Sequence, residues 1–107
     1  MNLSSESIQV IKIKGRLDIF RAVEIESQLR TMLESGCSLI VLDLSGLEYL
    51  SSSGLRICLD LLRQINARKG KLALCGMNPT VRKMFHMVEM EDLFEIHKNL
   101  GEALSSF

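Results

Sequence analysis

The chain has 107 residues, 47% of them hydrophobic and 24% charged, and its 13 basic and 13 acidic side chains give no formal net charge. This length fits one domain, and the balanced charge argues against a nucleic-acid surface, which normally carries a basic excess or stripe. No apolar run approaches the roughly 18 to 20 residues of a bilayer span, so we expect neither nucleic-acid binding nor membrane insertion.

The N-terminus and the cysteines indicate a cytoplasmic protein. The first six residues lack the basic and then apolar order of a signal peptide. Cys37, Cys58 and Cys75 are odd in number and widely spaced, and each lies among aliphatic residues. This pattern predicts reduced core thiols in the cytoplasm.

The first third of the chain predicts strand and then helix. Residues 8–14 (IQVIKIK) alternate well enough for a half-buried strand, and Gly15 separates them from a second short extended segment, residues 16–18. From residue 20 to 35 the apolar positions recur three or four apart, with charged residues between them. We therefore expect an amphipathic helix that stops at Gly36.

The middle of the chain repeats this order. Residues 38–44 are almost continuously apolar, which fits a central strand covered on both faces. A loop, residues 45–52, leads to a helix over 53–69, in which Leu55, Cys58, Leu59, Leu62 and Ile65 are expected to face inward. Gly70 ends that helix, and residues 71–75 (KLALC) supply another buried strand.

The last third predicts two more helices and one short strand. Asn78 is a good N-cap and Pro79 suits a first helical position. A strand over 93–96 and a helix over 99–104 follow. Alternating strands and helices predict a single compact α/β domain over 1–107, with a mixed, mainly parallel sheet of four to five strands and about four helices.

The serine triplet Ser51-Ser52-Ser53 lies where sites gather in such sheets, in a loop that leaves the carboxyl end of a strand. Two more such loops are expected, over residues 76–78 and 15–19. A serine before a helix can be a simple N-cap, which stabilises it by about 1 kcal/mol. A helix start also carries free N–H groups and partial positive charge, so it tolerates an added phosphate. Both interpretations of the triplet stay open from the residues alone.

Phosphorylation here predicts a binding switch. It adds about −1.5 to −2 charges, near Glu48, and near Asp18 and Asp43 if the strand ends converge. A partner docked over that surface would be repelled while the fold survives.

Three motifs in the same order resemble a known family. These are Gly15-Arg16-Leu17-Asp18, then Asp43-Leu44-Ser45 with Leu50 and Ser51-Ser52-Ser53-Gly54-Leu55, then Asn78-Pro79. Together they resemble the turn, the phosphorylation signature and the loop before the third helix of bacterial anti-sigma factor antagonists, the STAS-domain family. The resemblance covers nearly the whole chain.

The resemblance implies partner switching by a protein that is not an enzyme and needs no cofactor or metal. The unphosphorylated domain would bind an anti-sigma factor that is also a serine kinase, and so release a sigma factor. The kinase would phosphorylate Ser53, with Ser52 as the alternative acceptor, and a PP2C-type phosphatase would reset the protein. The implied partner-binding residues are Asp18, Ser51, Ser52, Gly54, Leu55 and Arg56.

One position departs from the family pattern. Well-studied members often carry an aspartate where this chain has Ser51, so one negative charge beside the acceptor is missing. Ser51 can still cap the helix. The alternative function is a structural STAS subunit of a larger assembly, such as a lipid-transport ATPase complex, in which the serines only cap the helix.

Other chemistry finds little support in the residues. A serine hydrolase needs a base within reach of its nucleophile, yet neither His86, expected to be partly buried in a helix, nor His97 lies in a loop near Ser53. No metal-ligand cluster or phosphate-binding glycine pattern is present. Asp43 is expected at a strand end, like the phosphoacceptor aspartate of response receivers. Those domains also need an acidic pair after their first strand, and this chain has none there. Met84, Met87 and Met90 lie three apart and are expected to fill core gaps, with an adaptable binding surface as the alternative.

Overall fold

Four parallel strands form one sheet in the computed structural model, which describes residues 7–107. The strands are β1 (Gln9–Leu17), β2 (Leu39–Leu50), β3 (Lys71–Cys75) and β4 (Glu95–His97), and they lie side by side in that order. The prediction of a mainly parallel sheet is confirmed, and every strand pair of the described residues is parallel. The first six residues, where we expect no signal peptide, lie outside the described part.

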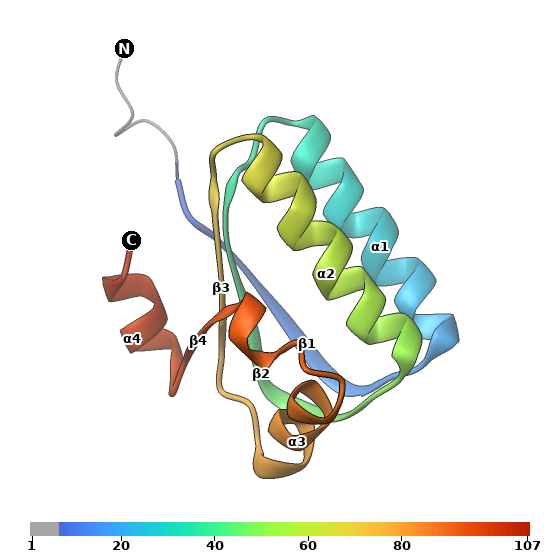
Figure 1. The fold of residues 1–107 in the computed structure, drawn as a ribbon. Helices are drawn as coiled ribbons and strands as arrows, with labels where there is room; N and C mark the ends of the chain where they lie inside the picture. The colour runs from blue at the N-terminus through green and yellow to red at the C-terminus, as the bar shows by residue number, and fades with distance from the viewer. Residues whose placement is uncertain (1–6) are drawn as a thin grey trace.

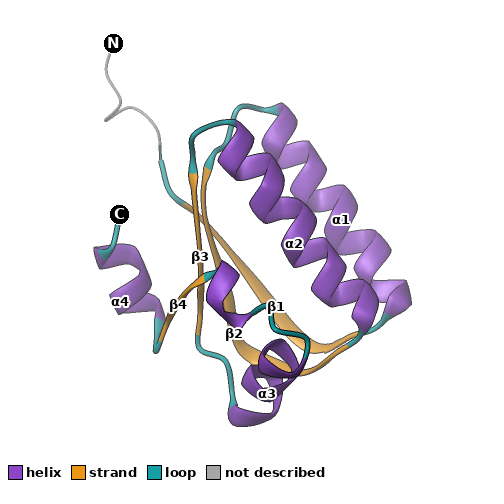
Figure 2. Ribbon diagram, in the orientation of Figure 1, coloured by secondary structure: helices purple, strands orange, loops and turns teal. Residues whose placement is uncertain are grey.

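The helices cover the two faces of the sheet unequally. The helices are α1 (Ile19–Glu34), α2 (Ser52–Ala67), α3 (Pro79–Met87) and α4 (Leu100–Ser105), with a short 3-10 helix, η2 (Glu91–Leu93), before β4. Helices α1 and α2 run side by side over one face, and the short α4 lies on the other (Figure 1). Figure 2 shows α3 below them, beside the ends of the strands. The predicted α/β architecture with about four helices is confirmed.

The larger part of the core lies beneath α1 and α2. It is built from the inward residues of β1 and β2, the buried stripe of α1 (Ala22, Ile25, Leu29 and Leu33), and Val81 and Phe85 of α3. A smaller cluster on the other face joins Val41, Ala73 and Cys75 to Ala103 of α4. Strands β2 and β3 are therefore covered on both faces, which explains their almost continuous apolar runs.

Strand β2 is longer than its apolar run predicts. We expected it to end at Leu44 and to be followed by a loop over 45–52, but it continues to Leu50. The separate extended segment expected over 16–18 is likewise the end of β1. The pairing of β1 with β2 shifts register twice, between Lys12 and Lys14 and between Gly15 and Arg16, and Gly15 takes a φ of +73° there. These irregularities break the period-two alternation by which a strand is recognised.

Helix α2 turns a slightly different face to the core than we predicted. Leu55, Cys58 and Ile65 are buried as expected, whereas Leu59 and Leu62 are half-buried, and Ile57 and Leu61 take the inner positions. The correction is a small rotation of the buried stripe, and Gly54 at the start of the helix is buried with it.

The cysteines are free thiols, as predicted, and two of them belong to the core. Cys58 and Cys75 are buried, and Cys37 is half-buried. Burial raises the pKa of Cys58 to about 12, and burial together with the negative charge of Asp43 raises the pKa of Cys75 to about 11. These two thiols are therefore protonated and poorly nucleophilic at neutral pH. Within residues 7–107 no helix is both long enough and apolar enough to span a bilayer.

Candidate functional site at the carboxyl edge of the sheet

Three helices begin directly after a strand at the same edge of the sheet, and each is capped by a polar side chain. Asp18 caps α1, Ser51 caps α2 and Asn78 caps α3. Asn78 also reaches across to β2, where its side-chain amide donates to the carbonyl oxygen of Leu47 at 3.0 Å. The predicted loops at the carboxyl ends of the strands therefore meet in one region of the surface.

Ser51 connects the end of β1 to the start of α2. Its hydroxyl accepts a hydrogen bond from the Gly54 N–H at 3.2 Å and donates one to the carbonyl oxygen of Leu17 at 3.0 Å. The Ser51 N–H donates to the same carbonyl oxygen, also at 3.0 Å. The expectation that Ser51 caps the helix is confirmed, and the hydroxyl serves the junction with β1 as well.

Asp18 lies beside this junction, immediately after Leu17. Its carboxylate oxygen Oδ1 accepts from the N–H groups of Phe20 and Arg21, at 3.1 and 3.0 Å. Because Leu17 and Leu50 are register partners in neighbouring strands, the residues that follow them, Asp18 and Ser51, cap two adjacent helix starts. The sequence places both on one surface, and the structure brings them together.

The remaining predicted site residues lie in the first turns of α2. Ser52 and Arg56 are exposed and Ser53 is half-buried. Gly54 and Leu55 are buried; a Cβ on Gly54 would lie 2.8 Å from the Leu50 side chain and 3.0 Å from that of Leu17. These two residues seat the helix on the strand ends, whereas Ser52, Ser53 and Arg56 face outward.

Asp43 does not belong to this region. It lies inside β2, seven residues before Leu50, or about 20 Å along an extended strand. Its carboxylate is buried and accepts from the Ser45 N–H at 3.0 Å. The expectation that Asp43 lies near the serines if the strand ends converge is therefore wrong, because β2 continues beyond the point where its apolar run stops. Glu48 is exposed and lies close to the end of the strand.

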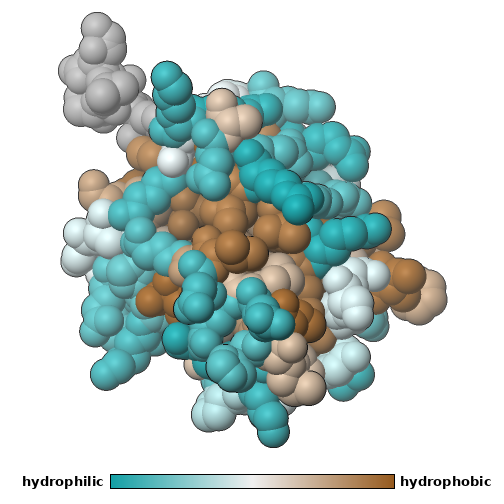
Figure 3. Space-filling view, in the orientation of Figure 1, coloured by the Kyte–Doolittle hydropathy of each residue, from teal (hydrophilic) through white to brown (hydrophobic). Residues whose placement is uncertain are grey.

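An exposed apolar group lies beside the capped helix starts, and the sequence pattern did not identify it. Ile19, Phe20 and Val23, in the first turns of α1, are 59%, 81% and 66% exposed. Figure 3 shows hydrophobic atoms projecting at the side of the molecule where α1 begins. The three residues do not belong to the set of α1 positions that recur three or four apart and are buried. Their departure from that spacing is the sequence signal that could have identified them. Exposed apolar side chains of this size are typical of a protein-binding surface.

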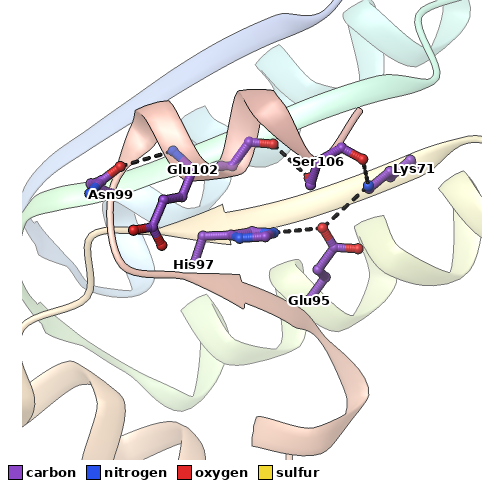
Figure 4. Close-up of polar contacts among 7 residues, drawn as sticks. Lys71, Glu95, His97, Asn99, Glu102 and Ser106 are labelled. Carbon is purple, nitrogen blue, oxygen red and sulfur yellow. Dashed lines mark hydrogen bonds and ion pairs between the residues drawn. The ribbon is translucent and has the colours of Figure 1, made fainter.

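Each of the two histidines contacts a glutamate carboxylate. We expected His86 to be partly buried, but its side chain is 74% exposed, and its Nδ1 lies 3.1 Å from the Glu91 carboxylate. The ring of His97 lies 2.6 Å from the Glu95 carboxylate, which Lys71 also contacts at 3.3 Å, under the end of α4 (Figure 4). Among the described residues neither histidine forms a hydrogen bond with Ser53, so the structure gives no support to serine-hydrolase chemistry.

The structure also locates the other candidate groups. Among the described residues no group of three or more His, Cys, Asp or Glu side chains could hold a metal ion. Met84 and Met90 are half-buried against the core, as predicted for gap-filling side chains, whereas Met87 is 70% exposed. A groove of about 300 Å³ between α1 and α2, with Leu29 and Leu61 in its lining, does not include the serines.

Comparisons with known proteins identify the family and the fold. The family model for the STAS domain matches residues 3–103. BtrV of Bordetella bronchiseptica, assigned as an anti-sigma factor antagonist, is 30% identical over 95 residues, which cover 89% of this chain and 82% of BtrV. The anti-sigma F factor antagonist of Paenibacillus polymyxa is 29% identical, with 98% of this chain and 95% of that protein covered. The structure of phosphorylated SpoIIAA from Bacillus superposes with a TM-score of 0.71 at 24% identity, covering 91% of this chain and 87% of that one.

Proposed function

The chain belongs to the STAS domain family, whose anti-sigma factor antagonists are regulatory binding proteins and not enzymes, and we propose that it is such an antagonist, switched by phosphorylation of Ser53. In the unphosphorylated state it binds an anti-sigma factor that is also a serine kinase, and the sigma factor held by that kinase is released. Phosphorylation ends the binding. A PP2C-type phosphatase restores it by hydrolysing the phosphoserine to serine and inorganic phosphate.

The observation that carries this proposal is that the three serines of the triplet differ in their hydrogen bonds. Ser51 alone caps α2, and within the described chain the hydroxyls of Ser52 and Ser53 form no hydrogen bond. A triplet that only capped the helix would need one serine. The two spare hydroxyls lie in the first turn of α2, and the adjacent helix start, that of α1, carries the exposed side chains of Ile19, Phe20 and Val23. A modification of either hydroxyl would therefore alter a surface suited to a protein partner.

Phosphorylation requires only an accessible hydroxyl from this chain, because the kinase supplies the catalytic groups. The Ser53 hydroxyl attacks the γ-phosphorus of ATP, the bond to ADP breaks, and a base of the kinase takes the hydroxyl proton. The new dianion lies at the positive end of α2, where it is tolerated. For a docked partner it is unfavourable, because it must be desolvated next to apolar contacts and close to Asp18. Binding is lost without a change of fold.

Ser53 is favoured over Ser52 by its position in the motif that resembles the family signature, immediately before Gly54-Leu55. Gly54 is the point at which the helix touches the side chains of Leu17 and Leu50. That contact sets the rotation of the first turn, so the residue before it has a defined position on the surface. Ser52, one position earlier and more exposed, is the natural comparison.

The decisive experiment is incubation with ATP, magnesium and an anti-sigma factor serine kinase from the same organism, followed by mass mapping of the peptides. We expect one phosphate on the wild type and on Ser52→Ala, and none on Ser53→Ala. Both variants remove a hydroxyl that has no hydrogen bond among the described residues, so neither should disturb the fold, which thermal melting checks.

Phosphate uptake by Ser53→Ala equal to that of the wild type would contradict the assignment of the site. Absence of phosphate on every variant would contradict the switch and leave the structural-subunit alternative, in which the serines serve only the helix start.

A further inference from the structure

We infer that Arg56 is a positioning residue for the phosphate on Ser53 and that its guanidinium folds back onto that group. Arg56 follows Ser53 by three residues and Ser52 by four on α2. Residues at these spacings are neighbours on a helix surface, with Cβ atoms about 5 to 6 Å apart. The inference rests on the proposed function, since it concerns the phosphate which that proposal places on Ser53.

The direction of the Arg56 side chain favours this contact. Long side chains on a helix lean toward the N-terminal turn, so we expect that of Arg56 to lie over the first turn of α2. With 3.6 residues per turn, Arg56 lies angularly between Ser52 and Ser53, roughly 40° from one and 60° from the other. It reaches both positions without leaving the exposed face of the helix.

Arg56 is also available for a new partner. It is exposed, and within residues 7–107 its guanidinium forms no hydrogen bond or ion pair. Two other arginines do have partners: Arg63 on the same helix lies 3.7 Å from Asp60, and Arg21 donates to the Lys14 carbonyl oxygen at 2.7 Å. A guanidinium has several N–H donors in a planar fork that matches phosphate oxygens.

The start of α2 supplies a second set of donors for the same phosphate. Among the first amides of the helix the N–H of Gly54 is taken by Ser51. The N–H groups of Ser52 and Ser53 precede the first intrahelical hydrogen bond, which Leu55 donates to Ser51. Backbone donors on one side and Arg56 on the other would hold the phosphate against the helix.

With this arrangement, phosphorylation changes the charge that a partner meets by more than the charge of the phosphate itself. Before phosphorylation a partner meets two neutral hydroxyls and a free cation. Afterwards it meets a phosphate, and the cation is no longer available because the phosphate has bound it. Arg56 thus serves the unphosphorylated surface and the phosphorylated one in opposite ways.

The test uses protein with phosphoserine incorporated at position 53 during synthesis, so that no kinase is needed. Phosphorus NMR follows the second ionisation of the phosphate from about pH 5 to about pH 8. A nearby cation favours the dianion, so Arg56→Gln should move the titration midpoint upward by about half a pH unit. Arg63→Gln, which removes the same charge two turns further along α2, should leave the midpoint within about a tenth of a unit of the wild type.

Equal midpoints for wild type and Arg56→Gln would overturn the inference. Arg56 is exposed and unpaired in the described chain, so its replacement should leave the melting temperature unchanged, and the comparison does not depend on refolding. The phosphate is installed without a kinase, and for that reason the outcome is independent of whether a kinase uses Ser53. A shifted midpoint together with failed kinase labelling would keep the contact and reject the proposed function.

Discussion

A serine at position 51 does more than an aspartate could do there. A carboxylate can cap a helix because it accepts hydrogen bonds, but an ionised carboxylate cannot donate one. The Ser51 hydroxyl accepts from Gly54 and donates to the carbonyl oxygen of Leu17. The serine therefore adds a hydrogen bond that a carboxylate could not make, from the cap of α2 to the end of β1.

Gly70 is the residue at which a side chain is least tolerated. A Cβ built there would lie 2.1 Å from the carbonyl oxygen of Ser38, which already accepts the Lys71 N–H at 2.8 Å. Since that neighbour is backbone, it cannot move aside as the tip of a side chain can. We expect Gly70→Ala to lower the free energy of unfolding by about 3 kcal/mol in urea titrations.

Gly101 provides the matched control for this substitution. It lies in α4, and a Cβ there would meet only the Asn99 side-chain oxygen at 3.4 Å. Alanine is a better helix former than glycine, so Gly101→Ala should leave stability unchanged or raise it slightly. A similar loss in both variants would mean that the close approach to Ser38 is not what requires glycine at position 70.

At the scale of elements, Asn78 joins α3 to β2 with two different atoms. Its Oδ1 accepts from the Val81 N–H at 2.8 Å, which caps α3, while its Nδ2 donates to the Leu47 carbonyl oxygen. Asn78→Ser should keep the cap but lose the reach to β2, at a loss of about 1 kcal/mol. Asn78→Ala should lose both, at about 2 kcal/mol.

Chemical denaturation of the two Asn78 variants separates the contributions. The expected order of stability is wild type, then Asn78→Ser, then Asn78→Ala. If the serine variant were as stable as the wild type, the contact with Leu47 would contribute nothing and α3 would be held by its apolar face alone. Val81 and Phe85 on that face are fully buried.

Elements with a regular pattern could be predicted from the sequence, and elements with an interrupted pattern could not. The continuous run Lys71–Cys75 and the Asn-Pro start of α3 appear as predicted. The second half of β2 was missed because its buried residues Leu47 and Leu50 are three apart. Such spacing departs from the strand period, and it follows from the register shifts with β1, which are a property of the pair of strands.

In the candidate site, too, only the features that depend on a local sequence pattern could be predicted. Local chemistry was enough to identify Ser51 and Asn78 as caps, because a cap depends on residues within one helical turn. Asp18 was identified only through the family resemblance, and its role as the cap of α1 was not predicted. The exposed group of Ile19, Phe20 and Val23 was missed, since apolar residues at a helix start are normally assigned to a core. Their exposure depends on how α1 packs against the sheet, which no local pattern contains.

At the scale of the whole molecule, a polar cluster attaches the end of the chain to the sheet. Burial pushes the pKa of Glu95 upward, but hydrogen bonds from His97, Ser106 and Lys71 outweigh it and hold that pKa below its usual value. Lys71 also donates to the Ser106 carbonyl oxygen and lies over the ring of Phe107. The cluster thus joins β3 and β4 to the residues that follow α4 (Figure 4).

This cluster predicts a loss of stability in acid. Because the pKa of Glu95 is lower in the folded chain than in the unfolded one, its contribution is present above the unfolded value and is lost as pH falls through the folded one. Glu95→Gln should be less stable than the wild type in urea near neutral pH, and the difference should shrink below about pH 4. Glu34→Gln, at an exposed position on α1, should show no such dependence. A difference that stays constant down to about pH 3 would contradict this assignment.

The order of the strands in the sheet is also their order along the chain. Each described strand therefore adds to the one made just before it, and no strand has to be inserted between two others. A chain of this kind can assemble while it emerges from the ribosome, with β1 and β2 docking through α1 before β3 is complete. Strand β4, with three residues, is added last and pairs on one side only. Because β4 is also the shortest described strand, we expect local opening to begin at this edge of the sheet, which is opposite the β1 edge.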